Sequence, residues 1–364
     1  KAGSEGYARQ VEAIRIQLVE KGGKAPEDIG KAFHYDSGCS YTLSRIVTKV
    51  MGKNCLALMQ ERVFDKMGFG EINWLTSPEG HNTGGWGMYL TAGKISALAQ
   101  LLLQKGEWNG EQLIPAWWTE EIGKIRVVIP EDEKKALTHY AYHIKAGKEI
   151  FAAEGAFGQY LICFRDYPVA IGITAGASEY LAADICLKYI KEAVQIPCEK
   201  ENLEEAQEKL EEKLVHLTLP KPEGDKKDTN EATKKLLNKR IVFTENPRQI
   251  ESAVISMVGE ELKLELTVAG EKKILFAGYK DWKCNDMYPN DFTKRYHAVS
   301  YAFDEDALYL SVGLLNTSYR EEYCLWVNSE NVVVGTWRPN VTYLPAEEDM
   351  TWKFTGTFEP SCIL

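Results

Sequence analysis

Apolar positions in the first half of the chain follow helical spacing in some segments and strand spacing in others. Leu43, Ile46, Val47 and Val50 lie three or four positions apart, which places them on one side of a helix. Other segments with a clear period are a second helix at 59–64, a third from Thr91 as N-cap to Gly106, strands at 150–152, 160–164 and 169–175, and a helix at about 179–194. Helices and strands in this mixture predict an α+β domain over residues 1–198.

A highly charged segment follows this domain. Seven Glu and three Lys fall between Glu199 and Lys213, and apolar residues recur among them at helical spacing, which predicts an amphipathic helix. A stretch with proline and glycine at 219–224 ends the helix, and the polar run 225–233 lacks the apolar residues needed to pack. We therefore expect residues 199–236 to form an amphipathic helix and a mobile linker.

The remainder of the chain, residues 237–364, changes to short runs in which apolar and polar residues alternate. Turns that contain Gly, Asn or Asp separate these runs. The runs are 254–258, 262–268, 273–277, 298–303, 307–315, 322–327, 331–337 and 352–358. Many short alternating strands predict an antiparallel β-sandwich or barrel as a separate domain.

The composition is that of an ordinary globular protein with a mildly acidic charge. The 364 residues include 43 Lys plus Arg and 53 Asp plus Glu, so the net charge is −10, and we expect no nucleic-acid partner. No window reaches the roughly 18 apolar residues that a membrane-spanning helix needs, so we expect no membrane span. The eight cysteines are far apart and form no CxxC pair. Since reduced thiols are typical of reducing compartments, we expect a cytoplasmic location.

Several familiar catalytic and cofactor-binding motifs are missing from the sequence. There is no GxGxxG or GxxxxGK[ST] phosphate loop, no HExxH metal motif and no GxSxG nucleophile elbow. His139 and His143 would share a face, but we find no third ligand for them, so we interpret both as structural histidines. The sequence predicts neither a metal nor a cofactor.

Four segments resemble a known family. Residues 30–41 (GKAFHYDSGCSY) look like the second active-site motif of the class C β-lactamase and penicillin-binding-protein superfamily of serine hydrolases, which reads Tyr-x-Asn or Tyr-x-Ser before a helix. Segments 84–91 (GGWGMYLT) and 100–115 (QLLLQKGEWNGEQLIP) are similar to longer family signatures, and 155–160 (GAFGQY) is like the third-motif strand. Over about residues 25–195, the resemblance implies an incomplete β-lactamase/transpeptidase-like domain with a helical part and antiparallel sheet strands.

The resemblance also implies catalytic roles. In this family a serine hydroxyl attacks an acyl carbon, and a Tyr–Lys pair shares protons so that the hydroxyl can lose its own near neutral pH. Tyr35 matches the tyrosine of that pair, and Ser37 matches the third residue of its motif. The backbone N–H of Phe157 would be one of two donors to the oxyanion. Without the resemblance, Tyr35 would be a tyrosine at a helix entry that is capped by Asp36 or Ser37.

The third motif implies a set of substrate-binding residues. Glu154, Gly155 and Ala156 stand where the family has Lys or His, then Thr or Gly, then Gly or Ala. An acid at the first position would repel a substrate carboxylate, so penicillin-like anions are expected to fit badly. The segment 145–147 (KAG) imitates the lysine form of this motif, but it lacks the Gly-Gln strand that follows, and we interpret it as a decoy.

The family's nucleophile is missing from this chain. It lies in a Ser-x-x-Lys segment upstream of the tyrosine motif, yet no serine from Ser4 to Ser361 has a lysine three positions later. The first 34 residues are also too few to supply both the serine-bearing helix and the early strands of the fold. Either the chain is the C-terminal portion of a longer serine hydrolase, or it is a homologue that has lost catalysis.

Two functions are consistent with these patterns. The first is a serine hydrolase homologue that is inactive as this chain alone and that, with an upstream nucleophile segment, would hydrolyse a small-molecule or peptide substrate such as an ester or a D-amino-acid peptide. An open sheet edge would then favour a homodimer or association with the missing N-terminal segment. The alternative is a non-catalytic ligand-binding or interaction protein. Its aromatic residues in the β-domain could line a barrel mouth or groove, although core packing explains them more simply: Trp282, Tyr288, Tyr296, Tyr301, Tyr309, Trp326, Trp337 and Trp352.

Overall fold

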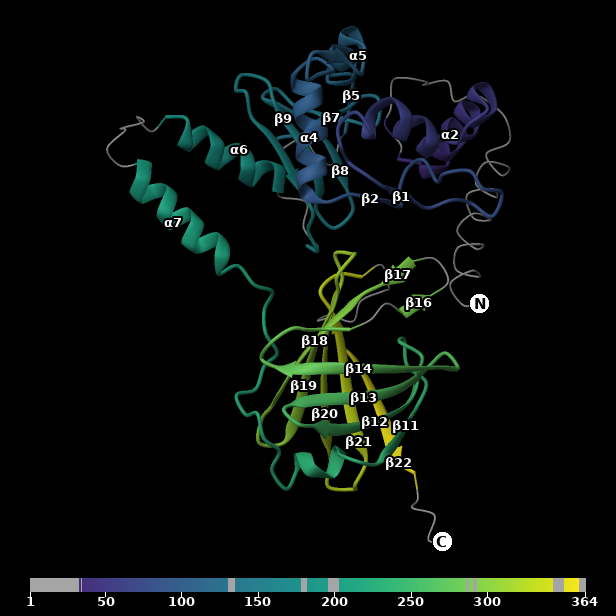
Figure 1. Ribbon diagram of the computed structural model, residues 1–364, viewed down its shortest axis with the longest axis vertical. Helices are drawn as coiled ribbons and strands as arrows, with labels where there is room; N and C mark the ends of the chain where they lie inside the picture. Colours follow the sequence, from purple (N-terminus) through teal and green to yellow (C-terminus); the bar gives the residue numbers. More distant parts are fainter. Residues whose placement is uncertain are drawn as a thin grey trace. The chain divides into compact units, whose positions relative to one another are not determined.

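The chain divides into two compact units (Figure 1). A computed structural model describes residues 33, 35–129, 135–177, 182–195, 203–285, 288–290, 293–342 and 350–359. The first unit comprises Lys1–Ala175 and Glu179–Ile196, and the second comprises Gly176–Ser178 and Pro197–Leu364. Helices and antiparallel sheets are both present, as the sequence predicts. In the part of the chain that is described, no helix is both long enough and apolar enough to cross a membrane.

A six-stranded sheet organises the first unit. Its strands follow one another in the order β10-β9-β8-β7-β6-β5, and every neighbouring pair is antiparallel. The strands are β5 (Val127–Val128), β6 (His139–Tyr140), β7 (Lys145–Ala146), β8 (Ile150–Gly155), β9 (Gln159–Phe164) and β10 (Ala170–Ile173). The three strands predicted from the sequence are β8, β9 and β10, so that prediction is confirmed.

Both faces of this sheet are covered, and alternate residues of the central strands β8 and β9 are buried on one face or the other. Helix α4 (Ala92–Leu103) packs on β9 and β10, where Phe151 and Cys163 are buried beside it. Helix α6 (Ala182–Ala193) contributes to the opposite cluster, which contains Ile150 and Ile162. The predicted N-cap of α4 is confirmed, because Thr91 Oγ1 accepts a hydrogen bond from the backbone N–H of Lys94 at 3.3 Å.

The rest of the first unit consists of short elements. They are α2 (Ser37–Met51), α3 (Cys55–Met59), the π-helical turn η1 (Gln60–Phe64), α5 (Ala116–Ile122), and the strand pairs β1 (Asn73–Trp74) with β2 (Met88–Tyr89) and β3 (Glu107–Trp108) with β4 (Glu111–Gln112). The predicted stripe on α2 lies on its exposed side, since Leu43, Ile46 and Val50 are all at least half exposed. The buried side of α2 instead presents Gly38, Ser40 and Ser44.

Helix α7 (Leu203–Val215) belongs to the second unit, and none of its residues is buried. The polar run after it has defined contacts, which differs from the mobile linker expected. Lys226 exchanges backbone hydrogen bonds with Phe303, and Asp225 forms an ion pair with Lys280 at 2.6 Å. The 3₁₀ turn η4 (Thr233–Leu236) follows, with the Leu236 side chain fully buried. Contacts to the next domain hold this run, although it has few apolar residues of its own.

Nine strands of the second unit form a closed barrel, so the sandwich alternative is wrong. They are β11 (Arg240–Phe243), β12 (Ile250–Val258), β13 (Glu261–Val268), β14 (Glu271–Tyr279), β18 (His297–Phe303), β19 (Ala307–Leu314), β20 (Arg320–Val327), β21 (Val333–Pro339) and β22 (Trp352–Phe358). The order β14-β13-β12-β11-β22-β21-β20-β19-β18 is antiparallel throughout. Eight antiparallel steps leave the first and last strands running in the same direction, and β14 accordingly pairs with β18 in parallel. Strand β15 (Lys283–Cys284) adds to β18, and β16 (Tyr288–Asn290) and β17 (Thr293–Arg295) form a separate hairpin.

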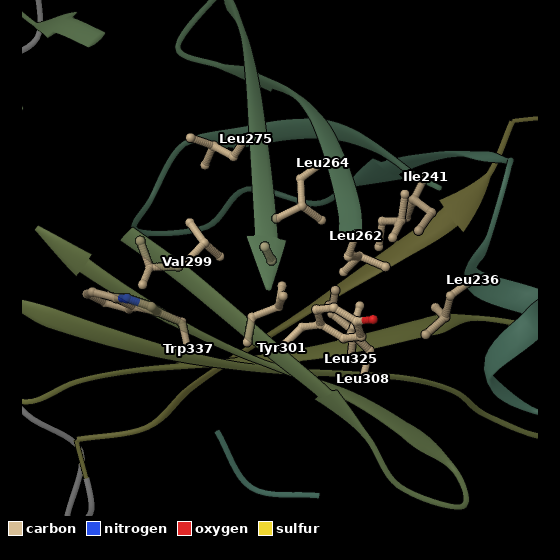
Figure 2. Packing of buried hydrophobic residues seen from close by; sticks show 14 of the residues in the cluster. Leu236, Ile241, Leu262, Leu264, Leu275, Val299, Tyr301, Leu308, Leu325 and Trp337 are labelled. Atoms are coloured by element: carbon tan, nitrogen blue, oxygen red, sulfur yellow. The ribbon is translucent and has the colours of Figure 1, made fainter. Parts of the chain in front are cut away.

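Side chains fill the interior of the barrel (Figure 2). Inward-facing residues from neighbouring strands meet there, among them Leu262, Leu264, Val299 and Leu308. Tyr301 and Trp337 belong to the same buried cluster. Two of the aromatic residues that suggested a ligand-binding mouth are therefore core residues, as the simpler explanation requires.

One buried ionic network interrupts this apolar interior. The Arg248 guanidinium lies 2.9 Å from Glu321 Oε1, and the Tyr323 hydroxyl donates to Glu321 Oε2 at 2.7 Å. The guanidinium also lies over the ring of Trp337, with 5.6 Å between Cζ and the ring centroid. Burial and the neighbouring Glu321 carboxylate raise the pKa of Tyr323 above its usual value. Both carboxylate oxygens of the buried Glu321 side chain are thus engaged, one by Arg248 and one by Tyr323, which compensates for the loss of hydration of the carboxylate.

Candidate active site

The N-terminus of α2 holds two of the residues that the sequence nominates. Asp36 is the N-cap, and its Oδ1 accepts a hydrogen bond from the Gly38 backbone N–H at 2.7 Å. Ser37 is the first residue of the helix and is half-buried, whereas Tyr35 precedes the cap with 65% of its surface exposed. The Tyr35 phenol is therefore available to other groups and is not buried in packing.

A glycine pair packs directly on this end of α2. Gly84 has φ +79°, and a Cβ added there would lie 2.4 Å from the backbone oxygen of Ser40. A Cβ on Gly85 would lie 3.1 Å from Ser40 Cβ and 3.7 Å from Ser37 Cβ. Only residues without a side chain allow this loop to approach the helix so closely. The segment 84–91, which resembles a family signature, thus has a local physical reason for the first two of its three glycines.

Polar contacts fix α2 to the same loop further along the helix. The Ser44 hydroxyl donates to the backbone oxygen of Asn82 at 2.8 Å, and the Tyr41 hydroxyl donates to Ser77 Oγ at 2.9 Å. Both hydrogen bonds lie on the side of α2 that faces residues 77–85. The helix that begins at Ser37 is therefore tied to this loop by hydrogen bonds as well as by packing.

The third-motif residues form the end of β8 and the turn that follows. Glu154 and Gly155 are the last two residues of β8, and Gly155 pairs with Gln159 of β9. Ala156 and Phe157 lie in the turn, where Phe157 adopts a left-handed backbone with φ +62°. A bulky residue in this conformation is strained, and such strain is concentrated at functional sites. The Gln159 side chain supports the turn by donating to the backbone oxygens of Ala156 and Ala175, at 3.3 Å and 2.5 Å.

Glu154 is compensated by a cation from the neighbouring strand. Lys145 Nζ lies 2.6 Å from Glu154 Oε1, and the two side chains are only 18% and 10% exposed. Lys145 pairs with Ala152 in the β7–β8 register, so its side chain lies on the same sheet face as Glu154, two residues further along β8. The segment at 145–147 is therefore more than a decoy, because its lysine lies beside the third motif. The predicted repulsion of anions by Glu154 is reduced accordingly, since the carboxylate is already paired.

Tyr140 connects the two halves of this region. It faces Lys145 across the β6–β7 pair, and its ring lies 4.6 Å from that of Phe33, centroid to centroid. Burial raises the pKa of Tyr140 and the Tyr35 phenol raises it further, whereas the Lys145 ammonium lowers it. The Tyr35 phenol and the Lys145 ammonium thus act on the pKa of Tyr140 in opposite directions. Sequence reasoning missed Tyr140, since a lone tyrosine on a two-residue strand has no recognisable pattern.

The structure brings some nominated residues together and leaves others apart. Tyr35 and Ser37 share the start of α2, and Glu154, Gly155, Ala156 and Phe157 share the β8–β9 hairpin. No hydrogen bond joins Tyr35 or Ser37 to Glu154, Gly155 or Ala156 in the described part of the chain. Lys145, the ion-pair partner of Glu154, faces Tyr140 across the β6–β7 pair, and the Tyr140 ring lies against Phe33, two residues before Tyr35. Predictions that concern residues 1–32 and 34, including the start of the tyrosine motif and the incomplete early fold, lie outside the described residues.

The two neighbouring histidines have separate partners. His139 Nδ1 lies 2.8 Å from Thr138 Oγ1, while His143 Nδ1 lies 3.3 Å from Ser40 Oγ. Among the described residues, no group of three His, Cys, Asp or Glu side chains is arranged to hold a metal ion. His143 instead connects the β6–β7 turn to α2, a contact that the sequence pattern did not indicate.

Comparison with known proteins gives matches to solved structures alone. No family profile and no curated protein matches the chain. One similar structure is a candidate 6-aminohexanoate-dimer hydrolase from Bacillus anthracis, with 24% identity, a TM-score of 0.41, and coverage of 47% of this chain and 45% of that one. Another is the octameric penicillin-binding protein homologue from Pyrococcus abyssi, with 10% identity, a TM-score of 0.35, and coverage of 90% of this chain and 66% of that one. Both belong to the β-lactamase/transpeptidase-like superfamily.

The resemblance of this chain to that superfamily lies in its own segments 30–41, 84–91, 100–115 and 155–160. This chain spans less than half the length of the Bacillus anthracis protein.

Proposed function

We propose that this chain is a β-lactamase- and penicillin-binding-protein-like serine hydrolase homologue that carries the tyrosine side of an acyl-transfer site. The observation that supports this most strongly is the series of titratable groups from Tyr35 through Tyr140 and Lys145 to Glu154, which ends beside the strained Phe157 turn. Ionisable side chains gathered next to a strained backbone are typical of catalytic sites. The first unit would then be the C-terminal portion of a β-lactamase-like domain.

Each residue has a defined role in the proposed reaction. A serine hydroxyl from a Ser-x-x-Lys segment would attack the acyl carbon and lose its proton to the pair that Tyr35 forms with the lysine of that segment, while the backbone N–H of Phe157 donates to the oxyanion. The leaving group would then take the proton from Tyr35, and water would hydrolyse the acyl-serine ester. Ser37, in the first turn of α2, would contact Tyr35, the residue that transfers the proton. Since this chain has no Ser-x-x-Lys, no acyl-enzyme can form on it alone.

The proposed substrate is an ester or a D-amino-acid peptide. Glu154, Gly155 and Ala156 form the edge against which the acyl group would lie, and the Lys145–Glu154 pair makes this edge electrically neutral overall. A neutral edge neither attracts nor strongly repels a substrate carboxylate. Amide or ester groups with hydrogen-bonding capacity therefore suit it better than substrates that need a dedicated cationic anchor.

The sheet supports the proposed association with a further polypeptide. Strand β10 has one neighbour, β9, within the described residues, and its sequence Ala170–Ile173 contains no charged residue and no proline. Natural edge strands normally carry such features to prevent pairing with other chains. A segment with the nucleophile, or a second copy of this chain, could complete the sheet at β10.

Covalent labelling tests the proposed function. The 364-residue chain, incubated with a fluorophosphonate or with penicillin, is expected to show no mass increase in intact-protein mass spectrometry. A version extended by the residues encoded immediately upstream of Lys1 is expected to gain one adduct on a serine of Ser-x-x-Lys. An adduct on the 364-residue chain would refute the proposed inactivity.

A further inference from the structure

The first turns of α2 and the β6–β7 hairpin meet at one side-chain hydrogen bond. Ser40 Oγ and His143 Nδ1 lie 3.3 Å apart, although 103 residues separate them in sequence. Ser40 is one helical turn beyond Ser37, and His143 lies between Tyr140 of β6 and Lys145 of β7. The bond therefore joins the element that carries Tyr35 and Ser37 to the element that carries Tyr140 and Lys145.

Ser40 has little freedom to leave this position. It is only 8% exposed, and a Cβ on Gly85 would lie 3.2 Å from its Oγ. The Gly84 backbone packs on the Ser40 carbonyl from the same side. Because the loop confines the hydroxyl, the Ser40 Oγ is a fixed point against which the hairpin can be placed.

His143 reaches Ser40 from an unusual backbone conformation. Its φ is +59°, in the left-handed region that few residues other than glycine adopt, although histidine and asparagine do so more often than most. The turn is held from its other side as well. The centroid of the Tyr142 ring lies 5.2 Å from that of the Trp118 ring and 4.9 Å from Cζ of the Arg126 guanidinium. A solvent-exposed histidine in a strained backbone, bonded to a buried serine, is a costly arrangement for a turn without a positioning role.

We propose that the Ser40–His143 hydrogen bond is the positioning contact of the site, which holds Tyr35 and Ser37 in register with Tyr140 and Lys145. Neither residue would touch the substrate. Ser40 and His143 would act by fixing the distance between the start of α2 and the β6–β7 hairpin. This inference rests on the proposed function and deepens it, because that register would place Tyr35 beside the third motif, residues 154–156.

The electrostatic effect of Tyr35 on Tyr140 gives a measure of this register that needs no catalysis. Tyrosine labelled with ¹³C at Cζ reports the ionisation of each phenol by NMR, and Tyr140→Phe assigns the resonance. In the wild-type chain, Tyr35→Phe is expected to lower the pKa of Tyr140, because one source of its elevation is removed. In a His143→Ala or Ser40→Ala background, Tyr35→Phe is expected to have less than half of that effect.

Rescue and control variants separate positioning from general loosening. His143→Asn is expected to restore the effect of Tyr35, because asparagine tolerates positive φ and carries hydrogen-bonding groups. Tyr142→Phe, in the same turn, is expected to leave it unchanged. The proposal is overturned if His143→Ala and Ser40→Ala stay folded by circular dichroism and retain the full effect of Tyr35→Phe. Failure of covalent labelling in the extended chain would overturn the hydrolase function and leave this result intact.

Discussion

Gly84→Ala is expected to destabilise the first unit by about 3 kcal/mol or more, one of the two largest effects that we predict for a single substitution. Two penalties combine at this position. An alanine at φ +79° has a strained backbone, which costs about 1–2 kcal/mol, and its Cβ would lie 2.4 Å from the Ser40 carbonyl oxygen, so the loop must move away from α2. The movement would also displace the support of Tyr35 and Ser37.

Gly80→Ala is the matched control for this substitution. Gly80 has nearly the same backbone angle, φ +82°, but no heavy atom lies within 4 Å of the position that its Cβ would take. It should therefore show the backbone penalty alone, about 1–2 kcal/mol. Equilibrium unfolding in urea, followed by circular dichroism, measures both variants. Equal losses for Gly80→Ala and Gly84→Ala would contradict the close packing of the loop on α2.

Glu321→Ala is expected to destabilise the barrel by about 3 kcal/mol. The substitution removes the acceptor for both the Arg248 guanidinium and the Tyr323 hydroxyl, and it leaves a cation with no counter-charge at the barrel interior. Breaking a buried ion pair from one side costs about 3–5 kcal/mol, and the partial exposure of Arg248 favours the lower end of this range. Chemical denaturation of the 364-residue chain, monitored by tryptophan fluorescence, reports the loss.

The adjacent residue provides a control for Glu321. Glu322 also contacts arginines, Arg320 at 3.2 Å and Arg338 more closely, but its side chain is 28% exposed and lies on the other side of the strand. Glu322→Ala should cost about 1 kcal/mol or less, as is usual for accessible ion pairs. If the two alanine variants unfold at the same denaturant concentration, the buried network contributes nothing particular to the barrel.

Local patterns in the sequence predicted most of the elements but not their partners. The alternation of apolar and polar residues identified the strands of the barrel. In a strand every second side chain points to the same face, so apolar residues two positions apart, such as Leu262 and Leu264, are buried together in the barrel interior. The choice between sandwich and barrel depended on whether β14 meets β18, a pairing of residues about 22 positions apart for which the sequence carries no local signal. The exposed side of α2 was likewise unpredictable, because its buried side is made of glycine and serine that pack on Gly84 and Gly85.

The candidate site shows the same division. Motifs nominated Tyr35, Ser37 and the Glu154–Phe157 turn, because these positions belong to segments with a recognisable order of residue types. Lys145 also stands in a motif-like segment, but its pairing with Glu154 depends on the β7–β8 register, which the spacing of residues along the sequence does not predict. The contribution of His143 depends on a tertiary contact with Ser40, which no spacing rule describes.

The rate of fluorophosphonate labelling in the upstream-extended chain tests the central claim most directly. If Tyr35 takes the proton from the nucleophile, Tyr35→Phe should slow labelling by roughly 100-fold or more, the usual contribution of a general base. Tyr189→Phe is the control, because Tyr189 is exposed to a similar extent, 60% against 65%, but lies on α6. The account predicts a large loss for Tyr35→Phe and none for Tyr189→Phe, and equal labelling rates in the two variants would contradict it.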